Sequence, residues 1–265
     1  MANGIGGTVI EVWTLTFVLV LARAGTFVFF LPVTGGRNTP HTIKVGLTVA
    51  LAVFWFSVWG TSPSAEFIQL AAGKHWLAYS VALFRETILG ALLGFLFGML
   101  MVPARIAGSY VAQEMGLTMA TISDPVTRQP ASVLTHIFEA LTVLVFFGLD
   151  VHHVLLLAMH SSFQLWSIGA PIPDSMILIV AAGVSDANEW GLMLAAPVGI
   201  CLFIATIVLL LLNRASPQLN LFSVGIVLRI ATGLGAMMLF VPVFIASLSR
   251  FFANTSSTIR SLFYF

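Results

Sequence analysis

The residues of this sequence that could do chemistry are five charged side chains inside or at the edges of long apolar segments: Arg23, Arg85, Glu86, Glu139 and Arg229. A charge costs roughly 2.5–3.5 kcal/mol when it enters the centre of a membrane, so each of these side chains must face protein or water. A row of such groups can form an ion or proton path, whereas isolated pairs fix the positions of neighbouring helices. No segment carries a cluster dense enough for a carrier site, and the sequence therefore favours structural pairing over an ion path.

Four histidines raise the question of a haem site. His136 is expected on one helix, and His153 with His160 on the next, which would suit two axial ligands. No second matched pair or cofactor motif supports this reading, and His152 and His153 fall at a predicted turn. The sequence also lacks the HExxH motif of zinc enzymes and the GxSxG motif of serine hydrolases. We therefore expect no catalytic residue, no cofactor and no metal.

The elements that must position the charged residues are long apolar helices. Of the 265 residues, 59% are apolar and 8% charged, whereas ordinary soluble domains carry about 25% charged residues. The main solvent of this chain is therefore lipid. A net charge of +1 cannot provide the basic surface that nucleic-acid binding requires. The single cysteine, Cys201, excludes an intramolecular disulfide and a cysteine-based metal cluster.

Seven apolar runs predict seven helical segments. They cover residues 9–31, 43–59, 79–102, 131–149, 154–168, 190–212 and 221–248. The fifth run is too short to cross a core of about 30 Å alone, and only four residues separate it from the fourth. We expect these two runs to form a helical hairpin with a polar tip. The prediction is one all-α domain over residues 1–265, a polytopic membrane protein with six to seven long apolar helical segments.

Two of the predicted helices carry glycines and one charged residue at intervals of four positions, so that these residues share one helix face; we call them the two small-residue series. The two series are Glu86, Gly90, Gly94 and Gly98 in the third segment and Gly225, Arg229 and Gly233 in the last. Faces that are nearly bare of side chains let helices approach closely in lipid, where no hydrophobic driving force brings them together. We expect both faces to pack helices, and two such faces suggest partner subunits.

The stretch from Arg105 to Pro130 is too polar to span a membrane, yet too apolar to lie free in water. Its composition leaves two interpretations open. One is an amphipathic helix at the membrane surface. The other is a segment buried at membrane depth, inside protein or beside a cavity.

The most specific motif is the run NRASPQLN from Asn213 to Asn220, followed by Phe222 and Gly225. It resembles the Pro-Gln-Leu-Asn segment of the FliR family of the flagellar type III export apparatus and of its counterpart, the T component of the injectisome export gate. Further agreement covers nearly the whole chain, at Arg23, Pro32, Pro40, Lys44, Glu86, Gly90, Gly94, Ala107-Gly108, Met115-Gly116-Leu117, Asp124-Pro125 and Pro197. The sequence departs at Glu114, where the family usually has Gln, and at Asp150-Val151, where it often has Asn-Gly.

The resemblance implies a non-enzymatic subunit of an export gate in the bacterial inner membrane, at the flagellar basal body. The expected partners are FliP-like, FliQ-like and FlhB-like subunits, membrane lipid, and the unfolded proteins that pass through the centre of a hollow helical hetero-oligomer. The family subunit is similar to a fusion of the FliP-like and FliQ-like types, and its helices can be raised out of the bilayer. The matching motifs serve both systems, and the chain length with the short tail after Phe251 favours the flagellar form.

The alternative function is a secondary transporter, which would use the intramembrane charges Arg23, Glu86, Glu139 and Arg229 as a coupling path. Such a transporter is expected to contain inverted repeats and broken helices that correspond between its two halves. The sequence has neither feature. The export-gate reading is therefore preferred.

In the FliR family a loop helps to plug the pore, and residues 107–123 match that role here. They include no Lys or Arg, which argues against a helix on the membrane surface. Gly108 and Gly116 permit close backbone approaches, and Met115 and Met119 would share a helix face and can repack around a varying shape. We expect these four residues and Glu114 to form the plug.

A rigid polar turn is expected between the last two long helices, formed by Pro217, Gln218, Leu219 and Asn220. Pro217 supplies no backbone donor, and Gln218 and Asn220 can bond the open helix ends. We expect this turn to matter for assembly, although an ordinary interhelical loop accounts for Gln218 equally well.

Overall fold

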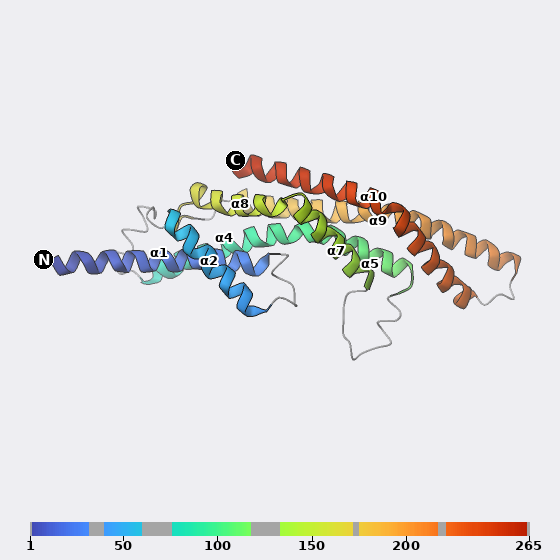
Figure 1. Ribbon diagram of the computed structural model, residues 1–265, viewed down its shortest axis with the longest axis horizontal. Coiled ribbons are helices and arrows are strands. Elements are labelled where there is room, and N and C mark those ends of the chain that lie inside the picture. Colours follow the sequence, from blue (N-terminus) through green and yellow to red (C-terminus); the bar gives the residue numbers. More distant parts are fainter. Residues whose placement is uncertain are drawn as a thin grey trace. The chain divides into compact units, whose positions relative to one another are not determined.

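The protein is helical apart from short turns in the residues that the computed structural model describes, which are 2–31, 40–59, 76–117, 133–171, 175–216 and 221–263. The helices are α1 (Ala2–Phe30), α2 (His41–Trp59), α4 (Trp76–Gly98), α5 (Val102–Glu114), α7 (Val133–Gly148), α8 (Val151–Leu165), α9 (Ser175–Ala215) and α10 (Leu221–Phe263) (Figure 1). Among them, five helical stretches are long and apolar enough to cross a membrane, and the bent pair α7 and α8 adds a sixth if it counts as one span. The predicted all-α, polytopic architecture is confirmed.

The last two helices are longer than the predicted runs. The 41 residues of α9 and the 43 of α10 extend for about 62 and 65 Å, twice the core thickness of about 30 Å. The predicted runs cover residues 190–212 and 221–248, but α9 also includes Asp186 and Glu189, and α10 also includes Arg250 and Arg260. A charged residue does not interrupt backbone hydrogen bonding, so a helix continues wherever water or protein replaces lipid.

A short 3-10 turn, η1 (Met99–Met101), connects α4 to α5. Pro103 lies in the first turn of α5, where its missing N–H costs no helical hydrogen bond. The resulting stretch, Trp76–Glu114, is one candidate span of 39 residues. From its sequence, the stretch that begins at Arg105 was expected to be too polar to span a membrane. In the structure, its first ten residues, 105–114, are helical and belong to this candidate span.

The residues form two compact units. The first comprises Met1–Leu100, His152–Val184 and Ser256–Phe265, and the second comprises Met101–Val151 and Ser185–Thr255. In the first unit α1 packs against both α2 and α4, and the rings of Phe27 and Phe97 meet edge to face at 5.9 Å. In the second unit α5 packs against α7, and Phe138 meets Phe244 in the same way at 4.9 Å.

A two-residue turn, Leu149 and Asp150, connects α7 to α8. α7 belongs to the second unit and α8, from His152 onward, to the first, so the hairpin of these two helices stays a prediction. Asp150 has φ 55°, a left-handed conformation that Asp tolerates better than most residues. The backbone N–H groups of Leu149 and Asp150 still donate to the carbonyls of Val145 and Phe147. Both residues of the turn thus keep their backbone donors bonded to α7, and both are exposed.

Candidate functional site

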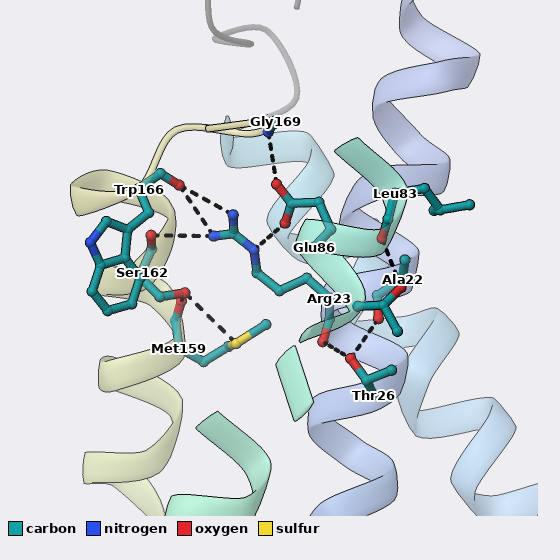
Figure 2. A network of polar contacts seen from close by, with 10 residues as sticks. Ala22, Arg23, Thr26, Leu83, Glu86, Met159, Ser162, Trp166 and Gly169 are labelled. Atoms are coloured by element: carbon teal, nitrogen blue, oxygen red, sulfur yellow. Dashed lines mark hydrogen bonds and ion pairs between the residues drawn. The ribbon is translucent and has the colours of Figure 1, made fainter. Parts of the chain in front are cut away.

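Two of the charges that the sequence places in apolar segments meet in the first unit. Arg23 of α1 and Glu86 of α4 are both fully buried, and the Arg23 Nε donates to Glu86 Oε2 at 2.5 Å (Figure 2). Removing two charges from water costs several kcal/mol for each ion, and their attraction offsets this cost only if further hydrogen bonds occupy the remaining donors and acceptors. The rest of the network supplies those bonds.

The other Arg23 donors bond to the C-terminal end of α8. Nη1 donates to the carbonyl oxygens of Ser162 at 3.2 Å and Trp166 at 3.3 Å, and Nη2 donates to Trp166 at 3.2 Å (Figure 2). The last carbonyls of a helix carry partial negative charge, so a cation there is stabilising. The guanidinium also lies 4.4 Å from the centre of the Phe163 ring. Arg23 therefore acts as a C-terminal cap for α8 from another helix.

The second oxygen of Glu86 holds the turn that follows α8. The backbone N–H of Gly169 donates to Glu86 Oε1 at 2.7 Å. Gly169 has φ 85°, a conformation that side chains disfavour, so glycine suits this turn. The network thus joins α1, α4, α8 and the turn after it. Since both carboxylate oxygens and three guanidinium nitrogens are engaged, the geometry fits structural pairing and offers no free base for a proton path.

The glycines of α4 lie where α1 crosses it. A Cβ built on Gly90 would lie 2.2 Å from the carbonyl oxygen of Arg23 and 2.3 Å from Thr26 Oγ1, and one on Gly94 would lie 2.6 Å from the carbonyl oxygen of Phe27. These distances are far below van der Waals contact. The backbone of α1 therefore occupies the space that side chains at these two positions would need.

The remaining members of the two small-residue series have other surroundings. A Cβ on Gly98 would lie 3.4 Å from its nearest neighbour, which is ordinary contact. On α10, the side chain of Met115 lies 2.6 Å from a Cβ built on Gly233, while Gly225 has only a side-chain atom at 3.7 Å. Arg229 lies between these two glycines, and its Nε is buried with no hydrogen-bond partner among the described residues. On α10, Gly233 therefore packs against the side chain of Met115 and not against the backbone of another helix.

A second ion pair links α5 and α7 in the second unit. Arg105 Nε donates to Glu139 Oε1 at 2.5 Å, and His136 Nδ1 lies 3.3 Å from Glu139 Oε2. The Arg105 and His136 side chains are each 56% exposed and that of Glu139 is 26% exposed. Sequence reasoning singled out Glu139 but missed Arg105 as its partner, because 34 positions separate them.

The residues expected to form the plug lie at the end of α5 and after it. Gly108 is buried where α5 meets the α7 backbone, with a Cα of α7 2.7 Å from the position of its Cβ. Glu114 is half-buried, and Met115 is fully buried. Gly116 turns the chain with φ 77°. Met119 lies outside the described residues, as do the four residues of the expected turn, Pro217–Asn220.

Comparison with known proteins finds similar sequences over most of the chain. The family described as bacterial export proteins, family 1, matches residues 14–255. The flagellar biosynthetic protein FliR of Bacillus subtilis (strain 168) is 28% identical over 250 residues, which cover 93% of each chain. FliR of Escherichia coli (strain K12) is 27% identical over 231 residues, covering 87% of this chain and 85% of the relative. FliR of Aquifex aeolicus (strain VF5) is 25% identical over 249 residues, covering 92% of each.

Proposed function

Because this chain belongs to family 1 of the bacterial export proteins, the FliR family, and is thus a membrane component of the flagellar export apparatus, we propose that it is a non-enzymatic subunit of the type III export gate. In this proposal it helps to form and plug the channel through which unfolded proteins cross the inner membrane. Its partners are FliP-like, FliQ-like and FlhB-like subunits. The observation that carries the proposal is the family match over residues 14–255, nearly the whole chain.

The surface of α9 supports an assembly with other proteins. Large exposed apolar side chains occur along this helix from Leu178 to Leu212, a rise of about 51 Å along the axis. At the typical tilt of about 20°, a lipid core of about 30 Å covers little more than half of that length. A large apolar surface outside the lipid is typical of a contact with another protein. Neighbouring subunits are therefore expected to cover the part of α9 that lies outside the lipid core.

The first prediction is that the chain purifies as part of a hetero-oligomer. An affinity-tagged version, extracted from its own host in mild detergent, should bring down at least two other small helical membrane proteins in fixed ratio. The physical reason is the apolar surface of α9 and α10 that the chain itself leaves uncovered. In α10, only 17% of the candidate span Val224–Ser261 is buried within the chain. Mass spectrometry of the purified material identifies the partners.

Purification of a tagged, unrelated membrane protein of similar abundance controls for chance capture. A monodisperse, fully helical monomer obtained without partners at the same detergent concentration would count against the gate. It would instead make the transporter the better explanation of the intramembrane charges.

The second prediction concerns the plug, which we place at residues 107–123. Deleting residues 108–115 should leave an assembled gate that leaks ions, because an apolar constriction excludes water and ions only while its side chains fill it. Leakage is measured as the loss of membrane potential in cells or vesicles, after co-purification has verified assembly. Glu114→Gln, which restores the residue that the family usually has, is the control and should remain tight.

An assembled gate that keeps its seal after this deletion would remove residues 107–123 from the sealing role. That result would revive the interpretation of this segment as an interfacial amphipathic helix.

A further inference from the structure

An open groove lies on the second unit, between α7, α9 and α10. The side chains that line it are apolar except Ser247, and they include Phe138 of α7, Met193 of α9 and Phe244 of α10. Its empty space is about 430 Å³ with the open side included. Along α10 the groove extends from Met237 to Ser247, a rise of about 15 Å, over which a helix with its side chains would fill roughly 1,200–1,700 Å³. The groove therefore has room for an extended, flexible chain but not for a whole helix.

Charged side chains of both signs lie one helical turn beyond one end of this groove. On α10, Arg250 follows the groove residue Ser247 by three positions, and on α9, Glu189 precedes the groove residue Met193 by four. Residues three or four apart share a helix face, so both charges continue the groove side of their helices. Both are exposed, and neither forms an ion pair within the part of the chain that the structure describes.

The charged end of the groove has the features of the edge of a lipid core. The rings of Trp190 and Phe251 meet there at 5.6 Å, so these parts of α9 and α10 lie side by side. From this level, residues 190–213 of α9 and 230–249 of α10 contain no charged side chain. The two stretches rise about 36 and 30 Å, which matches a core of about 30 Å. Tryptophan is also enriched at the membrane–water interface. When α9 and α10 cross a bilayer, the charged end therefore lies among the lipid headgroups.

We propose that the groove binds one acyl chain of a phospholipid with an ethanolamine headgroup, whose phosphate bonds to Arg250 and whose ammonium lies against Glu189. An acyl chain needs no polar partner along the apolar walls, and the flexible side chain of Met193 can adapt to its shape. The guanidinium fork suits a phosphate. The carboxylate of Glu189 attracts an ammonium group and repels an anionic headgroup, and Asp186, one turn further along α9, adds to both effects.

One zwitterionic headgroup supplies partners for both charges at the end of the groove. A helix of a partner subunit laid over the groove would have to bring a carboxylate to Arg250 and a cation to Glu189, and it would remove water from all four groups. The lipid leaves them at the water-exposed edge of the membrane. The site requires only that α9 and α10 lie in lipid, so it does not depend on the channel or the plug.

Photo-crosslinking tests this lipid site. The protein with its co-purifying subunits is placed in vesicles that contain a trace of phosphatidylethanolamine or of phosphatidylglycerol, each with a diazirine in one acyl chain. Mass spectrometry then measures the label on peptides that contain residues 193–198 or 237–247. We expect phosphatidylethanolamine to label these peptides roughly three- to fivefold more strongly than phosphatidylglycerol, the usual effect of one exposed charge pair.

Three variants assign the roles of the charges. Arg250→Gln should lower the labelling by both lipids about fivefold, the usual effect of one basic residue beside a headgroup. The double variant Asp186→Asn/Glu189→Gln should remove the preference for phosphatidylethanolamine. Arg214→Gln is the matched control, because it also removes an exposed cation from this unit, but 16 residues, or about 24 Å of helix, beyond Val198. Labelling of the groove should not change in this control.

Two results would overturn the lipid site. Equal labelling by the two lipids that Arg250→Gln leaves unchanged would mean that the groove meets only bulk lipid. Absence of label from these peptides, while the rest of α9 and α10 is labelled, would mean that a partner subunit covers the groove. A chain that purifies without partner subunits would count against the gate instead, and the same crosslinking on that chain in vesicles would still test the lipid site.

Discussion

Replacing Arg23 by methionine should lower the stability of the protein by ~3–5 kcal/mol, the usual loss when one partner of a buried ion pair is removed. Glu86 would be left as a buried, unpaired carboxylate, and the carbonyls of Ser162 and Trp166 would lose the donors that cap α8. The measurement is the midpoint of thermal unfolding of the purified gate in detergent. A decrease of roughly 10 °C is expected for a chain of this size.

Two further variants make this test specific. Arg105→Met also removes the arginine of an Arg–Glu pair, but that side chain is 56% exposed, and exposed pairs contribute at most about 1 kcal/mol. The double variant Arg23→Met/Glu86→Leu should lose less than the sum of its single variants, because the second substitution removes the charge that the first leaves unpaired. Equal losses for Arg23→Met and Arg105→Met, or strict additivity in the cycle, would contradict the role assigned to the buried network.

The sequence was sufficient to predict the helices because length and apolar composition decide what spans a membrane. The run at 79–102 became α4 with η1, and the run at 43–59 lies within α2. The helix ends were less predictable, since Asp186 and Arg250 mark the limit of apolar character and not of backbone hydrogen bonding. The short connection between α7 and α8 was predictable, but a short connection limits the distance between two helix ends and does not fix the angle of the helices.

The candidate site could be predicted only in part. Arg23 and Glu86 were identifiable because neither tolerates lipid. Their partners on α8 and the turn after it are backbone carbonyls and an N–H, which carry no sequence signal. The two small-residue series look alike in sequence, yet Gly90 meets the backbone of α1 while Gly233 meets a methionine side chain. Spacing alone therefore identifies a close contact but not what makes it.

Gly90→Ala should be the most damaging single-methyl change on α4. Its Cβ would lie 2.2 Å from the carbonyl oxygen of Arg23 and 2.9 Å from the carbonyl carbon, and backbone atoms cannot move aside as a flexible side chain can. The two helices would have to separate by about 1 Å to restore contact distances. Overpacking of this kind costs roughly 1–3 kcal/mol. The separation would also strain the Arg23–Glu86 bond, because Glu86 lies one turn from Gly90 on the same face.

Gly46→Ala on α2 is the matched control for this substitution. It adds the same methyl group to a helical glycine, but no atom lies within 4 Å of its Cβ. Alanine favours a helix over glycine by up to about 1 kcal/mol, so the control should be neutral or slightly stabilising. The midpoint of thermal unfolding of the purified gate should therefore fall for Gly90→Ala and stay unchanged or rise slightly for Gly46→Ala. A Gly90→Ala variant as stable as Gly46→Ala would mean that α1 and α4 can separate without loss, and the close crossing would not be what holds Arg23 against Glu86.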